Sequence, residues 1–471
     1  HSAKGNPLQG QHQPQVFYRP WPCRVLLMLE FGKGAYNRTR GNLPALETVN
    51  MFVEQSASQG VIMQSRPPMA ISGTVGIGPI RASSEKDGVF GGDTFTVSGT
   101  GLYRNTTLLG TITGNGVVSI AMRAGEVLVA ADGPLYSFDG ATLEEVTFPD
   151  DSSVTKAIYA DGRFVALEAT TGYIFWSAVG DGRSWDELDF AEVESDPDAT
   201  LDAVVLDGII VLAGPGSVEF WAPTGNADLP FTPIQQRVFE QGVITTGCMV
   251  QDDNTFFWIG NDKIPYRNGD VPQAIGGDFL VERIEASSTY RVFLLKDQRH
   301  KFVCIRLDGE TWAYDITTGE VFELRSYSHA NCRVGPDWGD DTNGTIWQFG
   351  DFDNDNDEGL VERILTAGEG LLGPKVYDSL TIECEVGTTP FLTGTYSEPV
   401  LEFRSSDDGA NIWSGWEEDT LGEQGDYRKV IEYRALGMFN LPGAMFQVRL
   451  TAPVWFRVSG IYDNQNAKGR A

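Results

Sequence analysis

The acidic segment DFDNDNDEGLVE has the residue types and spacing in this sequence that best fit metal binding. Asp351, Asp353 and Asp355 occupy positions 1, 3 and 5 of a loop like that of an EF-hand, and Glu362 occupies position 12. Carboxylate oxygens at alternate positions are the hard ligands that Ca²⁺ prefers. Position 6 is Asn356, where such a loop needs glycine, and no helical pattern flanks the segment. A Ca²⁺ site therefore stays a hypothesis beside a solvated acidic turn, which we expect, and no other cofactor is indicated.

Histidine chemistry has little support in this sequence. His1 and His12 lie in a Gln- and Pro-rich N-terminal segment, His300 lies in the charged run KDQRHK, which predicts a loop, and His329 lies in a polar turn. A general base must come within hydrogen-bond reach of the proton that it removes. The sequence contains no GxSxG or HExxH motif that would position such a base or a nucleophile. We therefore predict no catalytic residues and no enzymatic activity.

Two segments resemble the Asp-box turns of sialidases and other propellers. SAVGDGRSW contains Asp181 and Trp185, and SSDDGANIW contains Asp408 and Trp413. In such turns the aspartate accepts hydrogen bonds from backbone amides and the tryptophan packs beneath the turn, so both segments predict structural features. Trp416 follows the second turn, and we expect Trp413 and Trp416 to be packing residues rather than anchors for a partner.

The charge of the chain argues against binding to DNA or to membranes. The sequence has 65 acidic and 35 basic residues, a net charge of −30, and no basic stripe. Affinity for DNA backbones requires clustered Lys and Arg, and anionic lipid surfaces attract the same residues. The five cysteines are odd in number and form no CxxC pair, so we expect free thiols, with Cys304 and Cys384 buried in strands.

The elements that carry these residues are predicted to be short strands. From about residue 70 to residue 368, β-rich runs alternate with Gly, Asp or Asn turns, and marker aromatic residues recur every 33 to 48 positions. Repeats of this length are typical of propeller blades, which pack around an axis to protect their edges. We predict an all-β protein with a six- or seven-bladed β-propeller, although a long sandwich would give a similar pattern. The marker aromatics are Tyr103, Tyr136, Phe175, Phe220, Tyr266, Tyr314 and Trp347.

The pattern changes at a Gly-rich segment, residues 367–375, which we interpret as a hinge. Beyond it, apolar and polar residues alternate strictly, as in Leu380–Val386, which is typical of a half-buried antiparallel sheet. The predicted organisation is a poorly ordered arm over 1–34, a β-propeller over 35–368 and a C-terminal β-sandwich over 369–471. A strand near Val49–Glu54 is expected to close the propeller ring.

Several stretches together resemble a known family. They are LPALETVNMFVEQ, the long stretch from FWSAVGDGRSWDELDF to VEFWAPTG, LEFRSSDDGANIW and FQVRLTAPVWFRVSGI. In their order and spacing they are similar to the packaged-DNA stabilisation proteins of short-tailed bacteriophages, also described as tail hubs or head-closure factors. The resemblance covers residues 35–462, and the middle stretch is its most specific part.

The resemblance implies a structural protein of the virion, located in the tail at the portal vertex and assembled in the host cytoplasm. It implies a homo-oligomeric ring, expected to be a hexamer, that contacts portal or adaptor proteins on one side and the tail needle or tailspikes on the other. Such a ring closes the portal channel and retains the packaged DNA, which passes through without specific binding. The resemblance brings no catalytic residues and no membrane partner.

One alternative from another functional class remains open. A propeller of this composition could bind or hydrolyse glycans during recognition of the host surface. Glycoside hydrolysis needs two carboxyl groups about 5–10 Å apart in a cleft. The sequence has many acidic residues but does not identify such a pair.

Overall fold

The computed structural model describes residues 25–29, 46–56, 60–193, 199–297, 300–325, 332–334, 337–352 and 359–465. Within these ranges the chain is almost entirely β-structure, with one α-helix, α1 (Gly277–Ala286). The all-β prediction is confirmed. None of the described helices is long and apolar enough to cross a bilayer.

Strands between residues 69 and 349 form seven groups of four antiparallel strands. Tight turns join neighbouring strands, and Asp-Gly pairs provide two of them: Asp161 and Gly162 lie at φ 45° and 81°, and Asp207 and Gly208 lie at φ 51° and 82°. Two residues with positive φ match the twist of a β-hairpin, and Asp and Gly tolerate that conformation.

The bounds of these strands follow in chain order. The first group is β6 (Ile80–Ser84), β7 (Phe95–Ser98), β8 (Gly101–Arg104) and β9 (Thr107–Thr111), and the second is β10 (Ser119–Arg123), β11 (Glu126–Ala130), β12 (Tyr136–Phe138) and β13 (Leu143–Glu145). The third is β14 (Val154–Ala160), β15 (Arg163–Glu168), β16 (Tyr173–Ala178) and β17 (Asp181–Glu192), and the fourth is β18 (Asp202–Leu206), β19 (Ile209–Ala213), β20 (Val218–Pro223) and β21 (Phe231–Phe239). The fifth is β22 (Met249–Asp252), β23 (Thr255–Ile259), β24 (Pro265–Arg267) and β25 (Gln273–Ala274), and the sixth is β26 (Arg291–Asp297), β27 (His300–Arg306), β28 (Thr311–Asp315) and β29 (Val321–Glu323). The seventh is β30 (Cys332–Val334), β31 (Asp337–Gly339), β32 (Thr345–Phe349) and β5 (Met69–Thr74).

The seven groups are arranged in a ring. The first strands β6, β10, β14, β18, β22, β26 and β30 contact one another in that order, and β30 contacts β6 again. Successive groups share apolar cores, for example Val97 of β7 with Val127 of β11, and Leu167 of β15 with Leu212 of β19. All seven marker aromatics lie in the third strand of their group, in β8, β12, β16, β20, β24, β28 and β32. The sequence repeat is therefore the structural repeat.

A different strand from the expected one closes the ring. β5 joins the last group, with Thr74 opposite Thr345 and Met69 opposite Phe349. The expectation that residues 49–54 close the ring is wrong, because β3 (Met51–Ser56) pairs with β4 (Gly60–Ser65) instead. Alternate residues of β3 are buried on opposite sides: Phe52 packs into the core of the ring, and Met51 and Val53 pack into a separate core.

That separate core lies between two further sheets, which form a second unit. One sheet has the order β3-β4-β39-β34-β37, with β1 beside β39, and the other contains β2, β33, β38, β35 and β36 in that order. Side chains from both sheets, including Leu365, Leu380, Phe446 and Ile461, make one buried cluster. The strand bounds are β1 (Val25–Leu29), β2 (Thr48–Val49), β33 (Arg363–Gly370), β34 (Lys375–Cys384), β35 (Val400–Ser406), β36 (Glu417–Thr420), β37 (Ile431–Phe439), β38 (Gly443–Leu450) and β39 (Arg457–Gln465).

The Gly-rich segment 367–375 includes the end of a strand. β33 extends to Gly370 and pairs with β38, so the second unit begins before residue 369 and also includes strands from residues 25–29 and 48–65. Gly368 is required by close packing: a Cβ there would lie 2.4 Å from Sδ of Met445 and 2.7 Å from the carbonyl oxygen of Ala444. Of the predicted arm over 1–34, residues 1–24 and 30–34 lie outside the described residues.

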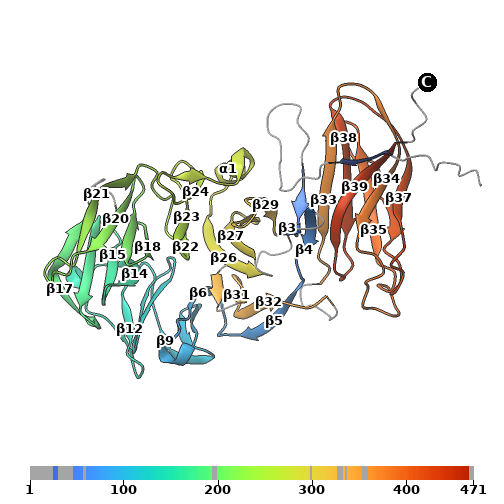
Figure 1. Cartoon of the computed structure of the whole chain (residues 1–471). Coiled ribbons are helices and arrows are strands. Elements are labelled where there is room, and N and C mark those ends of the chain that lie inside the picture. Colours follow the sequence, from blue (N-terminus) through green and yellow to red (C-terminus); the bar gives the residue numbers. More distant parts are fainter. Residues whose placement is uncertain are drawn as a thin grey trace, which may run out of the picture.

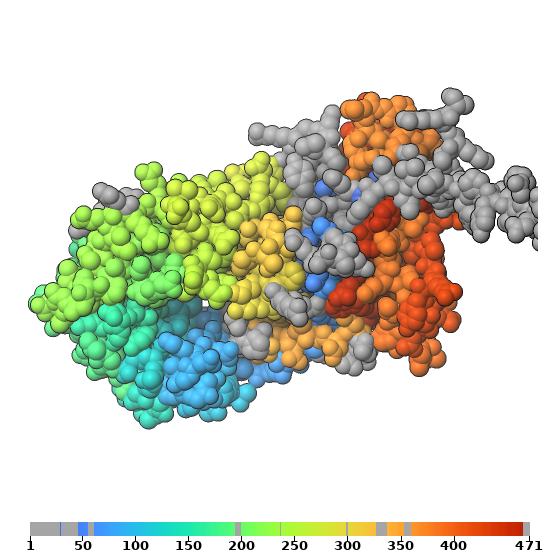
Figure 2. Space-filling view, in the orientation of Figure 1, coloured from blue at the N-terminus to red at the C-terminus, as the bar shows by residue number. Residues whose placement is uncertain are grey.

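One continuous sheet connects the ring to the second unit. The outermost strand of the sixth group, β29, pairs in parallel with β2 through Glu323 and Val49, and β2 pairs with β33 through Val49 and Ile364. Figure 1 shows the ring in colours from blue through green and yellow to light orange and the second unit mainly in orange and red, with the blue strands β3 and β4 on the side of the second unit that faces the ring. Blue N-terminal residues are visible between the yellow and red surfaces in Figure 2.

Candidate functional site

The histidine that the structure describes in the ring is a packing residue. His300 is 7% exposed and begins β27, so the prediction of a charged loop at this position is wrong. Its Nδ1 lies 2.8 Å from Oδ2 of Asp315, and its ring stacks on Phe302 and meets the edge of Phe52. The hydrogen bond to Asp315 raises the pKa of His300 against the opposing effect of burial. His1, His12 and His329 lie outside the described residues.

The predicted calcium ligands are only partly described. Asp351 is exposed and follows β32, whereas Asp353 and Asp355 lie outside the described residues. The carboxylate of Glu362 forms ion pairs with Arg325 at 3.2 Å and with Arg449 at 3.4 Å. The described part of the chain contains no group of three or more His, Cys, Asp or Glu side chains arranged to hold a metal. The calcium hypothesis stays a prediction, and Glu362 has a different set of partners that sequence reasoning missed.

The turn at SSDDGANIW has the geometry expected of an Asp-box. Oδ1 of Asp408 accepts hydrogen bonds from the backbone N–H groups of Asn411 and Ile412, both at 2.9 Å. Burial would raise the pKa of Asp408, but these hydrogen bonds and one from the Ser406 hydroxyl outweigh it, and the pKa is lowered. Trp413 packs against the guanidinium of Arg404, at 4.6 Å from the ring centroid.

The turn at SAVGDGRSW forms a hydrogen bond with the neighbouring strand group. The N–H of Gly182 donates to the carboxylate of Glu126 at 3.0 Å, and Nε1 of Trp185 donates to the carbonyl of Gly182 at 2.7 Å. Asp181 accepts one hydrogen bond, from the N–H of Arg183 at 3.0 Å. Both turns are therefore structural features of the fold.

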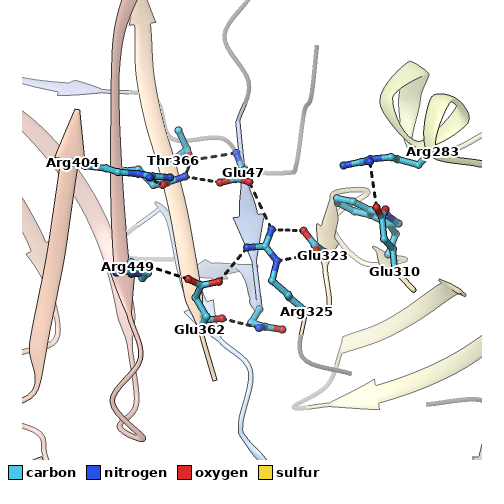
Figure 3. Close-up of polar contacts among 12 residues, drawn as sticks. Glu47, Arg283, Glu310, Glu323, Arg325, Glu362, Thr366, Arg404 and Arg449 are labelled. Atoms are coloured by element: carbon cyan, nitrogen blue, oxygen red, sulfur yellow. Dashed lines mark hydrogen bonds and ion pairs between the residues drawn. The ribbon is translucent and has the colours of Figure 1, made fainter. Parts of the chain in front are cut away.

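A connected group of charged side chains lies where the ring meets the second unit, and we call it the junction network. Arg325 follows β29 and forms ion pairs with Glu323 at 2.8 Å, with Glu362 at 3.2 Å and with Glu47 at 3.7 Å. Figure 3 shows its guanidinium between these three carboxylates. Burial alone would lower the pKa of Arg325, but the three carboxylates raise it, so this arginine is firmly cationic. Glu323 belongs to the ring, and Glu362 leads into β33 of the second unit.

The junction network continues across the second unit. Arg449 on β38 pairs with Glu362 and forms two bonds with Glu402 on β35, at 2.6 and 2.7 Å. The indole of Trp416 lies beneath two guanidinium groups, those of Arg404 at 4.3 Å and Arg449 at 4.1 Å. Cation–π contacts of this kind add to ion pairing because the ring face is electronegative. The network therefore extends from the last strand of the ring's sixth group to the Asp-box turn.

A buried arginine reinforces the same junction. Arg66 is 1% exposed and donates from Nε to Oδ1 of Asn50 at 2.8 Å and from Nη2 to the backbone carbonyl of Arg325 at 3.2 Å. Asn50 adopts φ 54°, and its side-chain amide donates to the carbonyl of Glu362 at 2.7 Å. Because these groups are enclosed, each unmade hydrogen bond would cost about 1–3 kcal/mol. These buried hydrogen bonds therefore stabilise the junction.

Nothing in the sequence alone indicated the junction network. Its members lie up to 400 residues apart, as for Gln447, whose Nε2 donates to Oε2 of Glu47 at 2.7 Å. Isolated Arg and Glu residues are common on protein surfaces. Only the tertiary structure shows that these residues lie together.

Comparisons with solved structures find β-propellers and other proteins at low similarity. The β-propeller domain of Cps50 (Swd1) from Myceliophteria thermophila is 12% identical and covers 59% of this chain and 99% of its own length, with a TM-score of 0.42. The extracellular domain of a hybrid two-component system from B. thetaiotaomicron is 10% identical, covers 81% and 58%, and has a TM-score of 0.41. An exo-β-1,3-galactanase from Phanerochaete chrysosporium is 10% identical, covers 75% and 96%, and has a TM-score of 0.31.

Sequence comparison with families gives a more specific result. No curated protein sequence matches the chain. Residues 28–335, which include the first six strand groups of the ring, match the family described as Phage_stabilise, bacteriophage P22 Gp10, β-propeller. The chain therefore belongs to the phage stabilisation family of the bacteriophage P22 Gp10 β-propeller.

Proposed function

We propose that this protein is a tail hub that closes the portal channel of a short-tailed phage and retains the packaged DNA. The family match over residues 28–335 carries this proposal, because the family is one of phage proteins that stabilise packaged DNA. In this proposal the seven strand groups are the blades of one propeller, and the second unit is a C-terminal β-sandwich.

The junction supports this proposal mechanically. A protein that retains pressurised DNA must transmit force between its parts without changing their relative position. A continuous sheet through β29, β2 and β33 joins the two units. The ion pairs of Arg325 and the hydrogen bonds of the buried Arg66 stabilise the same contact. Units joined only by a flexible linker would move relative to each other.

The remaining parts of the proposal concern partners and chemistry. We propose a homo-oligomeric ring, expected to be a hexamer, between portal or adaptor proteins and the needle or tailspikes, as part of the virion at the portal vertex. The net charge of −30 supports a conduit that repels DNA rather than binding it. The structural roles of His300 and of both Asp-box turns support a protein without enzymatic activity.

Particles assembled without this protein test the proposal. DNase-protected DNA is measured immediately after packaging and again after several hours, together with infectivity and with adsorption to host cells. We expect normal packaging followed by loss of DNA and of infectivity. Infectious particles that keep their DNA would refute the hub function, and particles that keep DNA but fail to adsorb would instead support the glycan-binding alternative. Reconstruction of the portal vertex with and without the protein tests the hexamer.

A further inference from the structure

Four ionisable side chains meet inside the second unit, and none of them belongs to the junction network. Lys375 begins β34, and its Nζ forms one ion pair with Glu369 of β33 and another, at 3.0 Å, with Oδ2 of Asp463 of β39. The hydroxyl of Tyr377 donates a hydrogen bond to the same oxygen of Glu369 that pairs with Lys375. Figure 1 shows β33, β34 and β39 together in the second unit. The cluster has no assigned role.

The cluster is largely enclosed. The side chain of Asp463 is 1% exposed, and those of Lys375 and Glu369 are 18% and 26% exposed. Nζ of Lys375 lies 4.4 Å from the ring centroid of Tyr377, and that ring packs edge-on against Phe439. Burial of two charges is costly even when they are paired. Transfer of one proton from the ammonium of Lys375 to the carboxylate of Asp463 leaves an amine and a carboxylic acid, both neutral, and so avoids this cost.

An amine and a carboxylic acid can form an amide when the fold holds them in position. Cγ of Asp463 is bonded to the oxygen that lies 3.0 Å from Nζ of Lys375. The reacting atoms are therefore close to the separation of about 3–3.5 Å from which oriented groups react, and such positioning gives effective concentrations of about 10⁵–10⁸ M. An enclosed site also excludes water, which would otherwise favour the free groups. The nitrogen must lose a proton as the C–N bond forms, and Glu369 contacts this nitrogen.

We propose that Lys375 and Asp463 become joined by a spontaneous amide bond, with Glu369 as the proton acceptor. The amine nitrogen attacks Cγ of Asp463, the C–N bond forms, and the carboxylate of Glu369 takes the proton that the nitrogen loses. Glu369 returns this proton to the departing hydroxyl group as the C–O bond breaks, and one water molecule leaves. Amine and acid thus give amide and water, so no oxidant or reductant is required.

Tyr377 positions the proton acceptor. Its hydroxyl donates to Glu369, and burial together with this carboxylate raises the pKa of Tyr377, so the hydroxyl remains a donor. The hydrogen bond fixes the carboxylate of Glu369 beside Nζ of Lys375, where the proton has to be accepted.

The ring contains a Lys–Asp pair that lacks these features. Lys156 lines the central cavity and pairs with the buried Asp202, and among the described residues no second carboxylate pairs with Lys156. The carboxylate of Asp202 accepts hydrogen bonds from the backbone N–H groups of Ala203, Gly247 and Met249. Amide formation would remove one of its oxygens and leave a buried donor without an acceptor, which is costly. We expect no bond at this pair, which is therefore an internal control.

The proposed bond would close a covalent loop over residues 375–463, which contains β34 to β39. β34 and β39 are neighbouring strands, paired from Leu380 and Asp463 to Cys384 and Val458. A force on the C-terminal strand would then act on a covalent bond as well as on hydrogen bonds. The inference does not depend on the hub function, because it follows from contacts within the second unit.

The mass of the purified full chain, measured after unfolding, tests the proposal directly. We expect a mass lower by one water molecule than the sequence gives. Trypsin should release residues 364–404 joined to residues 458–468, because it does not cleave after a lysine whose amine is blocked. Fragment spectra should place the link between Lys375 and Asp463 and should show Lys156 unlinked. A chain of full mass, or a loss of water that maps to any other residues, would refute the bond.

Three variants separate this bond from an ordinary ion pair. Glu369→Gln keeps the shape of the side chain but cannot accept the proton, so bond formation, followed by mass during cell-free synthesis, should slow at least about a hundredfold. Asp463→Asn should still form the amide but release ammonia, so its mass should fall by one ammonia molecule.

Lys375→Arg is the matched control, because it keeps a cation beside both carboxylates but has no amine that can form this bond. It should have its full mass and a lower melting temperature than the linked protein. Bond formation at the unchanged rate in Glu369→Gln would overturn the role of Glu369. Loss of water in Lys375→Arg, or a full mass in Asp463→Asn, would overturn the assignment of the bonded residues.

Discussion

Replacing Arg325 by methionine should weaken the junction by about 2 kcal/mol. Arg325 pairs with carboxylates at 2.8, 3.2 and 3.7 Å, and its side chain is 35% exposed. Pairs of exposed residues contribute about 0.2–1 kcal/mol, whereas breaking a buried pair costs about 3–5 kcal/mol. Arg325 is partly exposed and has three partners, so the stability lost on its replacement should lie between these two values. Methionine keeps much of the apolar contact of the side chain but leaves Glu47, Glu323 and Glu362 without their shared cation.

Urea unfolding followed by tryptophan fluorescence measures the effect. The loss in Arg325→Met should be largest in low salt and should shrink by about half in 1 M NaCl, because the Debye length falls to about 3 Å. Arg434→Met is the matched control: Arg434 is 75% exposed and pairs with Glu432 at 2.6 Å within one strand. That control should lose less than about 0.5 kcal/mol. Equal losses in the two variants, or a loss that does not respond to salt, would refute the reasoning.

Three further predictions follow from single sites. Gly182→Ala should lower the free energy of unfolding by about 2 kcal/mol in denaturant titrations, because the new Cβ would lie 2.3 Å from Cδ1 of Leu128. An unchanged unfolding midpoint would contradict this close packing, because Leu128 would then have moved away without cost. The pKa of His300 is raised in the folded protein, so its protonation stabilises the fold. This stabilisation is complete below the ordinary pKa of histidine and is lost as pH rises through the folded-state pKa. His300→Gln should therefore flatten the stability profile above about pH 6.5, and identical profiles for both proteins would contradict the role of Asp315. Chelation of calcium at fixed ionic strength should leave the melting temperature unchanged, whereas a decrease that Asp351→Asn abolishes would establish a site in the segment from Asp351 to Glu362.

Local sequence determined the strands and their repeat. The Asp-Gly pair at 161–162 encodes a hairpin because both residues tolerate positive φ, and it joins β14 to β15. The marker aromatics identify the third strand of every group, from Tyr103 in β8 to Trp347 in β32. These features depend on side chains a few residues apart, so the periodicity of the sequence contains them. The turn around Asp408 was predicted for the same reason.

Tertiary structure alone decided which distant segments meet. β5 rather than residues 49–54 closes the ring, because β3 is apolar on both faces and is buried between the ring and the second unit through Phe52 and Met51. Gly368 in the expected hinge packs against Met445 within the second unit. The ion pairs of Arg325 and the burial of His300 have no local signature. Alternation along a strand specifies which face is apolar, but the partner of that face is selected by the packing of the whole chain.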